Sequence, residues 1–430
     1  MKHNLKKTQA ALDKIGKGFC LAKWTQATLH LGTGLTHSCH HTKAHPINIA
    51  QLEKNPSALH NTDRKQSDRQ IMLSGNWVSD CSYCKVVEDA NAGYSDRIMK
   101  SSAEWSVEDY DRIRQRKWDT EVGFPRSLEV SFSNVCNFAC AYCGPTFSSQ
   151  WVEDIEKNGP YIVDNKMYNN TRVTQIPNRE NNPYIEAFDT WLPDIIENLY
   201  ELRITGGEPL LSKHTTKILE MIKDGLYKNL DFAINTNACP PAGKWDTFCA
   251  LLKTIEERKS CKSLTVYVSC ESTGAQAEYA RDGLNYDMLV KNVETILQTT
   301  SYVKVSFMST VNCLALPSLT DFTKWVARLK EVYGERRVRI DFAKLKHPDF
   351  LDVQFSSKIL KAKLIETNNF VSNNNFFIDR EKERLSRIIN SIQDYNTENI
   401  MSAKFLDFIK AYDKRRDLKF EDTFNKDDFL

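Results

Sequence analysis

The middle of the chain alternates short apolar runs with helix-length segments, and this alternation limits the fold more than any other feature. Six apolar runs have the length and composition of strands, and the segments between them have helical length. Such alternation is typical of parallel βα units. The predicted strands lie near 128–133, 201–205, 230–235, 264–270, 303–310 and 336–342, and the predicted helices near 147–157, 185–198, 212–226, 243–258, 284–298 and 318–333.

The bulk composition is that of an ordinary globular protein. The chain has 430 residues, of which 41% are hydrophobic and 27% charged, so it can form two or three domains. Its 58 basic and 56 acidic residues give a net charge of +2, and no overall field favours nucleic acid or an anionic membrane. The sequence has neither a long apolar run nor the apolar core of a secretory signal. We therefore expect a cytoplasmic protein without a membrane partner, and nucleic acid is a disfavoured partner.

Three cysteines directly follow the first predicted strand. Cys136, Cys140 and Cys143 have the spacing Cys-x3-Cys-x2-Cys. Thiolates this close in one loop favour a shared soft metal ion or an iron–sulfur cluster. A closed structural site takes four protein ligands, whereas three ligands leave one position open for chemistry. Two alternatives stay open: buried cysteines that act as small apolar residues, and a zinc site with a distant fourth ligand.

A second group of cysteines precedes the predicted core. Cys20 and Cys39 belong to the pattern Cys-x13-Gly-x4-Cys, and Cys81-x2-Cys84 follows a polar stretch. Four cysteines in two pairs can close a complete cluster or a zinc site. Because these cysteines form metal-like groups and not a disulfide framework, we expect a reducing compartment. A histidine of the intervening stretch could also replace one cysteine, and the candidates are His37, His40, His41 and His45.

The three-cysteine loop, with Tyr142 before its last cysteine, resembles the cluster-binding loop of radical S-adenosylmethionine (SAM) enzymes. Gly206-Gly207-Glu208-Pro209, after the second predicted strand, resembles the motif that holds the methionyl amino group of SAM in that family. The resemblance implies a partial (β/α)6 TIM-type barrel and a [4Fe–4S] cluster with Cys136, Cys140, Cys143 and SAM as ligands. It further implies that SAM is reductively cleaved to a 5′-deoxyadenosyl radical, which abstracts hydrogen from a substrate.

The same resemblance assigns polar residues after other predicted strands to SAM. Parallel barrels gather their active sites at the carboxyl ends of the strands. Ser269 would face the ribose or carboxylate side of SAM, and Arg281 would pair with the carboxylate, which suits a guanidinium fork. Asn312 would border the adenine, and Asn235 ends the third strand. From the residues alone, Asn235 and Ser269 are equally well explained as strand-end caps.

The pattern Cys-x13-Gly-x4-Cys resembles the first half of the auxiliary-cluster domains called twitch or SPASM. In most such enzymes this domain follows the core, whereas here it precedes it, as in N-terminal-twitch radical SAM proteins. The resemblance implies an auxiliary [4Fe–4S] cluster on Cys20, Cys39, Cys81 and Cys84. We expect it to relay an electron during oxidation of an alcohol or a peptide carbon. An electron donor such as flavodoxin or ferredoxin is the implied partner.

The predicted organisation is an auxiliary iron–sulfur domain over 1–122, a radical SAM core over 123–345 and a helical extension over 346–430. The substrate stays unidentified, and a peptide, a sugar or another small molecule would fit. One alternative is a radical SAM methyl- or sulfur-transferring enzyme that acts on RNA, although no basic stripe supports it. Another is a non-catalytic zinc-binding interaction protein, which leaves the Gly206–Pro209 motif and Arg281 unexplained.

Three further segments have predicted roles. The polar insertion 158–184 is expected to be a substrate lid or a flexible excursion. The Asn-rich stretch 368–375 is expected to be a loop, and Asp413, Arg415 and Arg416 a solvated face.

Overall fold

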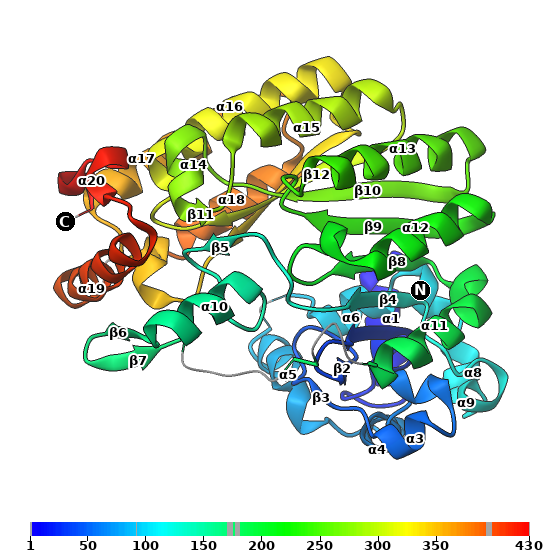
Figure 1. The fold of residues 1–430 in the computed structure, drawn as a ribbon. Helices are drawn as coiled ribbons and strands as arrows, with labels where there is room; N and C mark the ends of the chain where they lie inside the picture. The colour runs from blue at the N-terminus through cyan, green and yellow to red at the C-terminus, as the bar shows by residue number, and fades with distance from the viewer. Residues whose placement is uncertain (1, 92, 170–174, 177–180, 393–397, 430) are drawn as a thin grey trace. The chain divides into compact units, whose positions relative to one another are not determined.

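The computed structural model describes residues 2–91, 93–169, 175–176, 181–392 and 398–429, and it has an α/β fold with parallel strands (Figure 1). The chain divides into two compact units. The first contains Met1–Ser133, Thr174–Thr205 and Tyr227–Phe232, and the second contains Asn134–Val173, Gly206–Leu226 and Ala233–Leu430. The division passes through strand β9 (Tyr227–Thr236).

The first unit is organised around strand β4 (Ser127–Ser131). Strands β1 (Gln26–His30) and β8 (Glu201–Thr205) pair with β4 in parallel, one on each side. Strands β2 (Leu35–His37) and β3 (His45–Pro46) continue the sheet beyond β1 with antiparallel pairing. The N-terminal segment therefore contributes a strand that joins β4 directly.

The helices of the first unit are mostly short, and a buried apolar cluster holds several of them together. Leu12, Phe19, Trp24 and Trp118 all belong to this cluster. Large aromatic side chains contribute most of the apolar area that such small elements can bury. The helices are α1 (Leu5–Asp13), α2 (Ala22–Thr25), α3 (Ile49–Leu52), α4 (Asp63–Leu73), α5 (Ser82–Asp89), α6 (Asp96–Ser101), α7 (Glu104–Val107), α8 (Tyr110–Arg114), α9 (Trp118–Glu121) and α11 (Pro183–Ile195).

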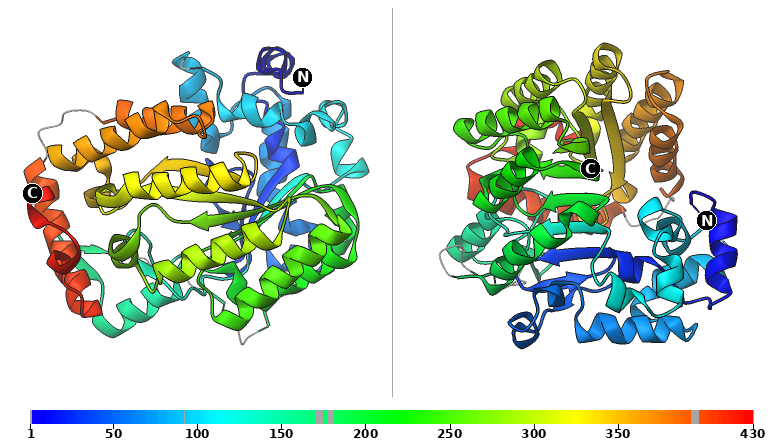
Figure 2. Two further views of the ribbon diagram at one scale, coloured as in Figure 1. Left: turned by 90° about the horizontal axis from the view of Figure 1, so that it is seen from above. Right: turned by 90° about the vertical axis from the view of Figure 1, so that its right-hand side faces the viewer.

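The second unit contains a parallel sheet in which neighbouring strands follow chain order. Strand β12 (Lys304–Val311) pairs with β10 (Cys261–Ser269) on one side and with β13 (Val338–Lys344) on the other. The C-terminal half of β9 lies beyond β10. Helices α13 (Ala242–Arg258), α15 (Tyr286–Thr299) and α16 (Leu316–Tyr333) cover one face of this sheet (Figure 2). The unit also contains α12 (Lys213–Asp224), α14 (Gly274–Ala280) and the strand pair β5 (Ala139–Cys140) and β11 (Arg281–Asp282).

All six predicted strands and the six predicted helices between them are present. Two strands begin earlier than predicted, because β9 starts at Tyr227 and β10 at Cys261. The early part of β9 contains exposed Lys228 and Asn229, whose polarity hides the strand from an apolar pattern. The α/β class with a parallel sheet is thereby confirmed.

The compact units do not follow the predicted boundaries after residues 122 and 345. Strand β1, from the predicted auxiliary domain, pairs in register with β4, so that Leu29 lies opposite Val130. Both side chains are fully buried, and this burial ties the two segments into one unit. The domains 1–122, 123–345 and 346–430 were predicted from their motifs and not from how compactly the chain packs. They stay predictions.

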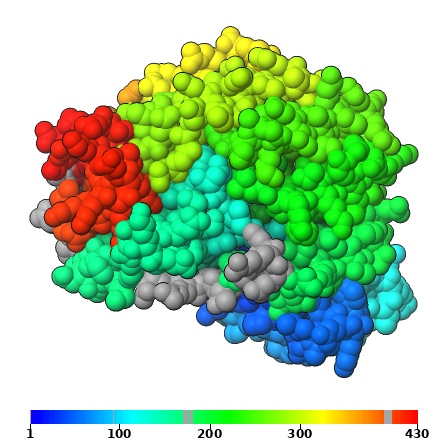
Figure 3. All heavy atoms as spheres, viewed as in Figure 1, coloured from blue at the N-terminus to red at the C-terminus, as the bar shows by residue number. Residues whose placement is uncertain are grey.

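The C-terminal helices are α17 (Lys358–Asn373), α18 (Asp379–Asn390), α19 (Glu398–Arg416) and α20 (Phe420–Thr423). The prediction of a loop at 368–375 is wrong, because α17 continues through most of this stretch to Asn373. Buried Leu360, Leu364, Thr367 and Val371 recur at helical spacing, and this burial outweighs the modest helix propensity of asparagine. The segment 402–429 lies directly beside α10 (Ser149–Asn158) and the hairpin of β6 (Tyr161–Val163) and β7 (Lys166–Tyr168) (Figure 3).

Part of the expected lid, residues 170–174 and 177–180, lies outside the described residues. Among the residues that the structure describes, each helix is too short or too polar to cross a membrane.

A buried ion pair connects α18 to the rest of the second unit. The Lys330 ammonium donates to both carboxylate oxygens of Glu381, at 2.8 and 2.7 Å. The two side chains are 0% and 4% exposed. Glu381 also accepts the backbone N–H groups of Ile340 in β13 and of Ile378, each at 3.0 Å. The carboxylate therefore joins α16, α18 and β13.

We expect Glu381→Ala to lower the free energy of unfolding by about 3–5 kcal/mol, because Lys330 would stay buried without its partner. The control is Glu383→Ala on the same helix, whose side chain is 63% exposed. Its expected effect is within about 0.5 kcal/mol. Urea unfolding followed by circular dichroism measures both values. Equal effects of the two substitutions would contradict the prediction.

Candidate metal centre

The three-cysteine loop follows β4 and is held by short contacts within the second unit. The N–H of Cys143 donates to the carbonyl of Cys140 at 2.9 Å, which closes a tight turn. Strand β5 pairs with β11 so that Cys140 lies opposite Arg281. The indole N–H of Trp151 in α10 donates to the Cys140 carbonyl at 2.9 Å. The three cysteines are free and half-buried.

The three sulfurs lie near enough to influence one another. Burial, together with the charges of Glu208 and Cys143, raises the pKa of Cys136 to about 12. Burial also raises the pKa of Cys140, and ionised Cys143 and Cys136 add to the rise because like charges repel. A bound cation would remove this repulsion and stabilise all three thiolates.

The surroundings of the sulfurs fit a thiolate-bound cluster. The N–H of Phe138 donates to the Cys136 sulfur at 3.4 Å, and Nη1 of Arg281 lies 3.9 Å from the Cys140 sulfur. Hydrogen bonds and positive charge at the sulfurs stabilise the anionic form and tune the reduction potential of iron–sulfur clusters. Cys136, Cys140 and Cys143 could therefore hold such a cluster and leave one iron position without a protein ligand.

The glycines of the Gly206–Pro209 motif allow this segment to pack against the start of the cysteine loop. Gly206 has a φ of 131°, which favours glycine. A Cβ on Gly207 would lie 2.3 Å from the carbonyl oxygen of Val135. The N–H of Glu208 donates to that same carbonyl at 2.7 Å. The two glycines therefore allow the backbone of this segment to lie close to the backbone of the cysteine loop.

Glu208 connects this segment to the end of β9. Its buried carboxylate accepts the N–H of Leu210 at 3.0 Å, the hydroxyl of Thr236 at 2.9 Å and the N–H of Asn237 at 2.6 Å. Burial raises the pKa of Glu208 to about 7, although these three donors act in the opposite direction. Pro209 opens the short helix Pro209–Leu211 beside it. Sequence reasoning missed Thr236 and Asn237 as partners, although the polar run after the predicted strand was visible.

Arg281 is engaged by a carboxylate of its own chain. Its Nε and Nη2 donate to the two oxygens of Glu271, at 3.0 and 2.5 Å, and the hydroxyl of Tyr142 donates to Glu271 at 2.7 Å. The guanidinium carbon lies 5.4 Å from the centre of the Tyr142 ring. A buried guanidinium needs such an anionic partner. The pairing of Arg281 with the SAM carboxylate stays a prediction, and sequence reasoning missed Glu271.

The remaining predicted SAM contacts lie in or after strands of the second unit. Asn235 lies in β9 and Ser269 ends β10, and both are half-buried. Asn312 is fully buried, donates to the Thr310 carbonyl at 2.8 Å and accepts the N–H of Leu314 at 3.0 Å. The Asn312 amide therefore bonds to backbone groups within two residues of it. Its contact with adenine stays a prediction.

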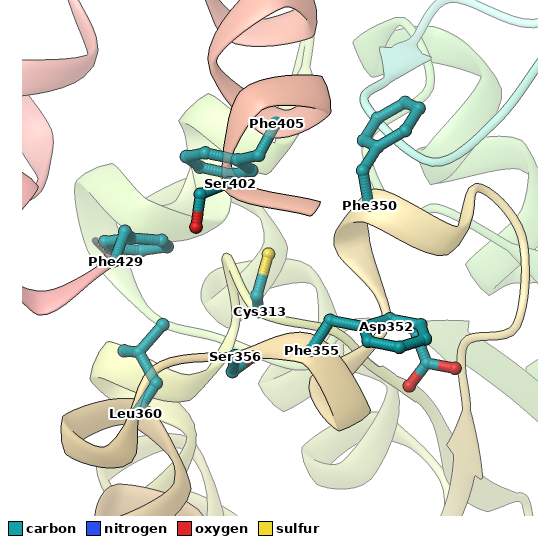
Figure 4. Close-up of a pocket in the computed structure, with 9 residues that line it drawn as sticks. All are labelled: Cys313, Phe350, Asp352, Phe355, Ser356, Leu360, Ser402, Phe405 and Phe429. Atoms are coloured by element: carbon teal, nitrogen blue, oxygen red, sulfur yellow. The ribbon is translucent and has the colours of Figure 1, made fainter. Parts of the chain in front are cut away.

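The C-terminal segment covers the chain just after β12. A cavity of about 20 Å³ lies beside Cys313 and is lined by aromatic side chains that include Phe350, Phe405 and Phe429 (Figure 4). This volume suits about one water molecule, so this cavity is far too small for a nucleoside.

The four N-terminal cysteines are brought together in the first unit. Burial raises the pKa of Cys81 to about 12 and that of Cys84 to about 11. The charges of Cys20 and Cys39 contribute to both of these shifts, and Cys39 also raises the pKa of Cys20. This mutual influence indicates that the four sulfurs lie in one region of the first unit. No three of these four described sulfurs lie within 4.8 Å of one another, which is wider than sulfurs bound at about 2.3 Å to a single zinc ion would be, so the larger iron–sulfur cluster fits them better.

Helix α6 supplies hydrogen-bond donors to these sulfurs. The Ser101 hydroxyl lies 3.9 Å from the Cys20 sulfur. The Arg97 backbone N–H bonds to the Cys84 sulfur and lowers the pKa of its thiol, against the effect of burial, whereas the Ser95 hydroxyl donates to Glu88 at 2.5 Å. The Arg97 side chain donates to Glu88 and Asp13 at 2.8 Å, so its partners are carboxylates of this chain.

The histidines that could replace a cysteine have other partners. His37 contacts the Cys39 carbonyl at 2.9 Å, and His45 contacts the Thr62 hydroxyl at 2.8 Å. Nε2 of His40 and of His41 lie 3.3 and 2.9 Å from Asp96. The Lys100 ammonium lies 3.1 Å from Nδ1 of His40, where a metal-bound histidine would usually meet an acceptor. We interpret this last group as an ion-paired cluster.

Comparisons with known proteins support the radical SAM superfamily. A GTP 3',8-cyclase from Aliarcobacter butzleri is 26% identical over 202 residues, which cover 46% of this chain and 50% of the relative. One from Mannheimia succiniciproducens is 24% identical over 247 residues, or 56% of this chain and 60% of the relative. One from Sulfurimonas denitrificans is 31% identical over 111 residues, or 26% and 27%.

The chain thus spans between about a quarter and three fifths of the length of these curated relatives. No family model matches the chain. GTP 3',8-cyclases are radical SAM enzymes, and the relatives therefore support this superfamily as the family of the chain.

The pKa of Glu208 implies a pH dependence of stability with a definite sign. The carboxyl titrates near 4.5 when unfolded and near 7 when folded, so the folded protein binds more protons between these values. The free energy of unfolding should therefore fall by up to about 3 kcal/mol as the pH rises through this interval. We expect this decrease to be absent in Glu208→Gln, as measured by denaturant unfolding of the metal-free proteins. Parallel pH profiles of the two proteins would contradict the prediction.

Proposed function

We propose that this protein is a radical SAM enzyme that reductively cleaves S-adenosylmethionine and abstracts hydrogen from an unidentified substrate. The observation that carries the proposal is a single loop that holds three half-buried cysteines, whose charges raise one another's pKa, and against which the Gly206–Pro209 segment packs. Three protein ligands leave one iron of a [4Fe–4S] cluster for SAM, and the cluster when bound supplies the electron for cleavage.

The chain's own residues have separate tasks in this proposal. Cys136, Cys140 and Cys143 hold the cluster, while Arg281 places positive charge 3.9 Å from the Cys140 sulfur. Glu208 keeps the Gly206–Pro209 segment fixed relative to the end of β9. Within the second unit, parallel strands β10, β12 and β13 neighbour one another in chain order, which supports a partial (β/α)6 TIM-type barrel.

The N-terminal cysteines form the second part of the proposal. Cys20, Cys39, Cys81 and Cys84 would close an auxiliary [4Fe–4S] cluster of the twitch type and leave no iron for a substrate. A closed cluster suits electron relay, so we favour oxidation of an alcohol or a peptide carbon. A flavodoxin or ferredoxin would donate electrons, and the twelve free cysteines suit the reducing cytoplasm.

The relatives' substrate is not carried over. The name GTP 3',8-cyclase assigns GTP to those proteins, whereas the longest of the three matches covers 60% of its relative. A peptide, a sugar or another small molecule remains the proposed substrate class. An RNA-acting methyl- or sulfur-transferring enzyme and a zinc-binding interaction protein are the alternatives that the following experiments separate.

Replacement of Cys136, Cys140 and Cys143 by alanine tests the catalytic centre. After anaerobic reconstitution, we expect two cubane clusters in the wild type and one in the triple variant, with loss of SAM cleavage, because the open-site ligands are gone. Iron and sulfide analysis and detection of 5′-deoxyadenosine give the two readouts. Zinc in place of iron, or unchanged SAM cleavage in the variant, would refute the proposed mechanism.

Replacement of Cys81 and Cys84 by alanine tests the auxiliary centre. We expect the loss of one cluster with retention of SAM cleavage, because the two cysteine groups are separate sets of ligands. The Mössbauer spectrum should show a single remaining cluster, in which one iron changes its signal when SAM is added. Cys249, which is half-buried in α13 and belongs to neither group, provides the control Cys249→Ala with unchanged iron content. An unchanged iron content in the double variant would exclude these residues as ligands.

A further inference from the structure

The last turns of α19 contact the two strands that flank the candidate metal centre. Tyr412 is fully buried, and its hydroxyl lies 3.3 Å from the Ala139 carbonyl and 3.1 Å from the Tyr279 carbonyl. Ala139 precedes Cys140 in β5, and Tyr279 lies just ahead of Arg281 in β11. One hydroxyl from the C-terminal helix thus connects β5 with the end of α14, which leads directly into β11, and in this ladder Cys140 lies opposite Arg281.

Arg416, one turn further along α19, reinforces the same ladder. Its Nε donates to Asp282 in β11 at 2.9 Å, and its guanidinium carbon lies 3.9 Å from the centre of the Tyr412 ring. It also lies 5.3 Å from the centre of the Trp151 ring, and the Trp151 indole donates to the Cys140 carbonyl. The Arg416 side chain is only 7% exposed. The predicted solvated face at this position is therefore wrong, because α19 turns these residues inward.

Two neighbours fix α19 in this position. The Tyr279 hydroxyl donates to Asp413 at 2.5 Å. The guanidinium of Arg415 donates to the carbonyls of Gly159 and Pro160, at 2.9 and 3.1 Å. The helix therefore lies against α14 on one side and against the end of α10 on the other, as its contact with the teal segment in Figure 3 also shows.

We propose that α19 positions the three-cysteine loop, with Tyr412 and Arg416 as positioning residues for the metal centre. Strand β5 is only two residues long, and the antiparallel pair that it forms with β11 is too short to be rigid alone. Buried contacts from a third element restrict the loop before any metal binds, and such preorganisation keeps ligands at their working separations. The role in a metal centre rests on the proposed function, whereas the restriction of the loop does not.

Tyr412→Phe tests the proposal, because it removes only the hydroxyl. In the metal-free full chain, we expect amide hydrogen exchange in the peptide that spans 138–143 to become at least about fivefold faster. In the reconstituted chain, we expect the SAM-dependent change of the electron paramagnetic resonance spectrum to weaken and SAM cleavage to fall about tenfold. Arg416→Lys keeps the positive charge but removes the planar guanidinium, and it should change the loop exchange and the SAM response in the same directions. This variant replaces Tyr412→Phe as the test if Tyr412→Phe does not fold.

The matched control is Tyr302→Phe, which removes a hydroxyl 3.9 Å from the Cys261 sulfur at the opposite end of β10. It should leave loop exchange and the spectrum at wild-type values. Unchanged loop exchange in Tyr412→Phe, or equal acceleration in the control, would overturn the positioning role. A wild type without any spectral response to SAM would instead overturn the proposed function, and with it the role of α19 in a metal centre.

Discussion

The candidate metal centre depends on the electrostatic repulsion among three half-buried thiols in a single loop. Water cannot screen their negative charges well at partly buried positions, and each ionised sulfur makes ionisation of the next more costly. Because their pKa values are raised, the metal-free thiols stay protonated, and contacts from four neighbours keep them in one loop: the ladder of β5 and β11, the indole of Trp151, the Gly206–Pro209 segment and helix α19. A cation shared by the sulfurs would convert the repulsion into attraction, which is why the loop suits a cluster.

The buried charges around this loop are satisfied by partners from the same chain. Glu208 receives three donors and Arg281 is paired with Glu271, so neither is left as an isolated buried charge. The two residues nevertheless act on the sulfurs in opposite directions. Glu208 raises the pKa of Cys136, whereas Arg281 lowers that of Cys136 and of Cys140. The protein thereby sets the charge balance around the loop with side chains that come from separate strand ends.

The parts of the fold that were predictable from sequence are those in which local pattern and burial agree. Strands such as β10 and β12 bury alternate or consecutive apolar side chains and are bounded by polar turns, so they could be recognised as strands from the sequence. The Asn-rich end of α17 was misjudged, because buried Thr367 and Val371 belong to a helical face that composition alone conceals. Arg416 was misjudged for a similar reason, since a charged side chain near the end of a helix resembles a surface residue until its partners are known.

The sequence by itself determined the chemistry available to this protein: two groups of cysteines with metal-like spacing, a glycine-rich acidic motif and a series of βα units. These properties are local, because ligand spacing and periodicity are set by covalent neighbours. Only the tertiary structure decided that Glu271 pairs with Arg281, that the Ser101 hydroxyl lies beside the Cys20 sulfur, and that Tyr412 contacts the carbonyl of Ala139, next to Cys140. Such partners are brought together by packing between segments far apart in the chain. This packing cannot be inferred from the periodicity or the spacing of residues.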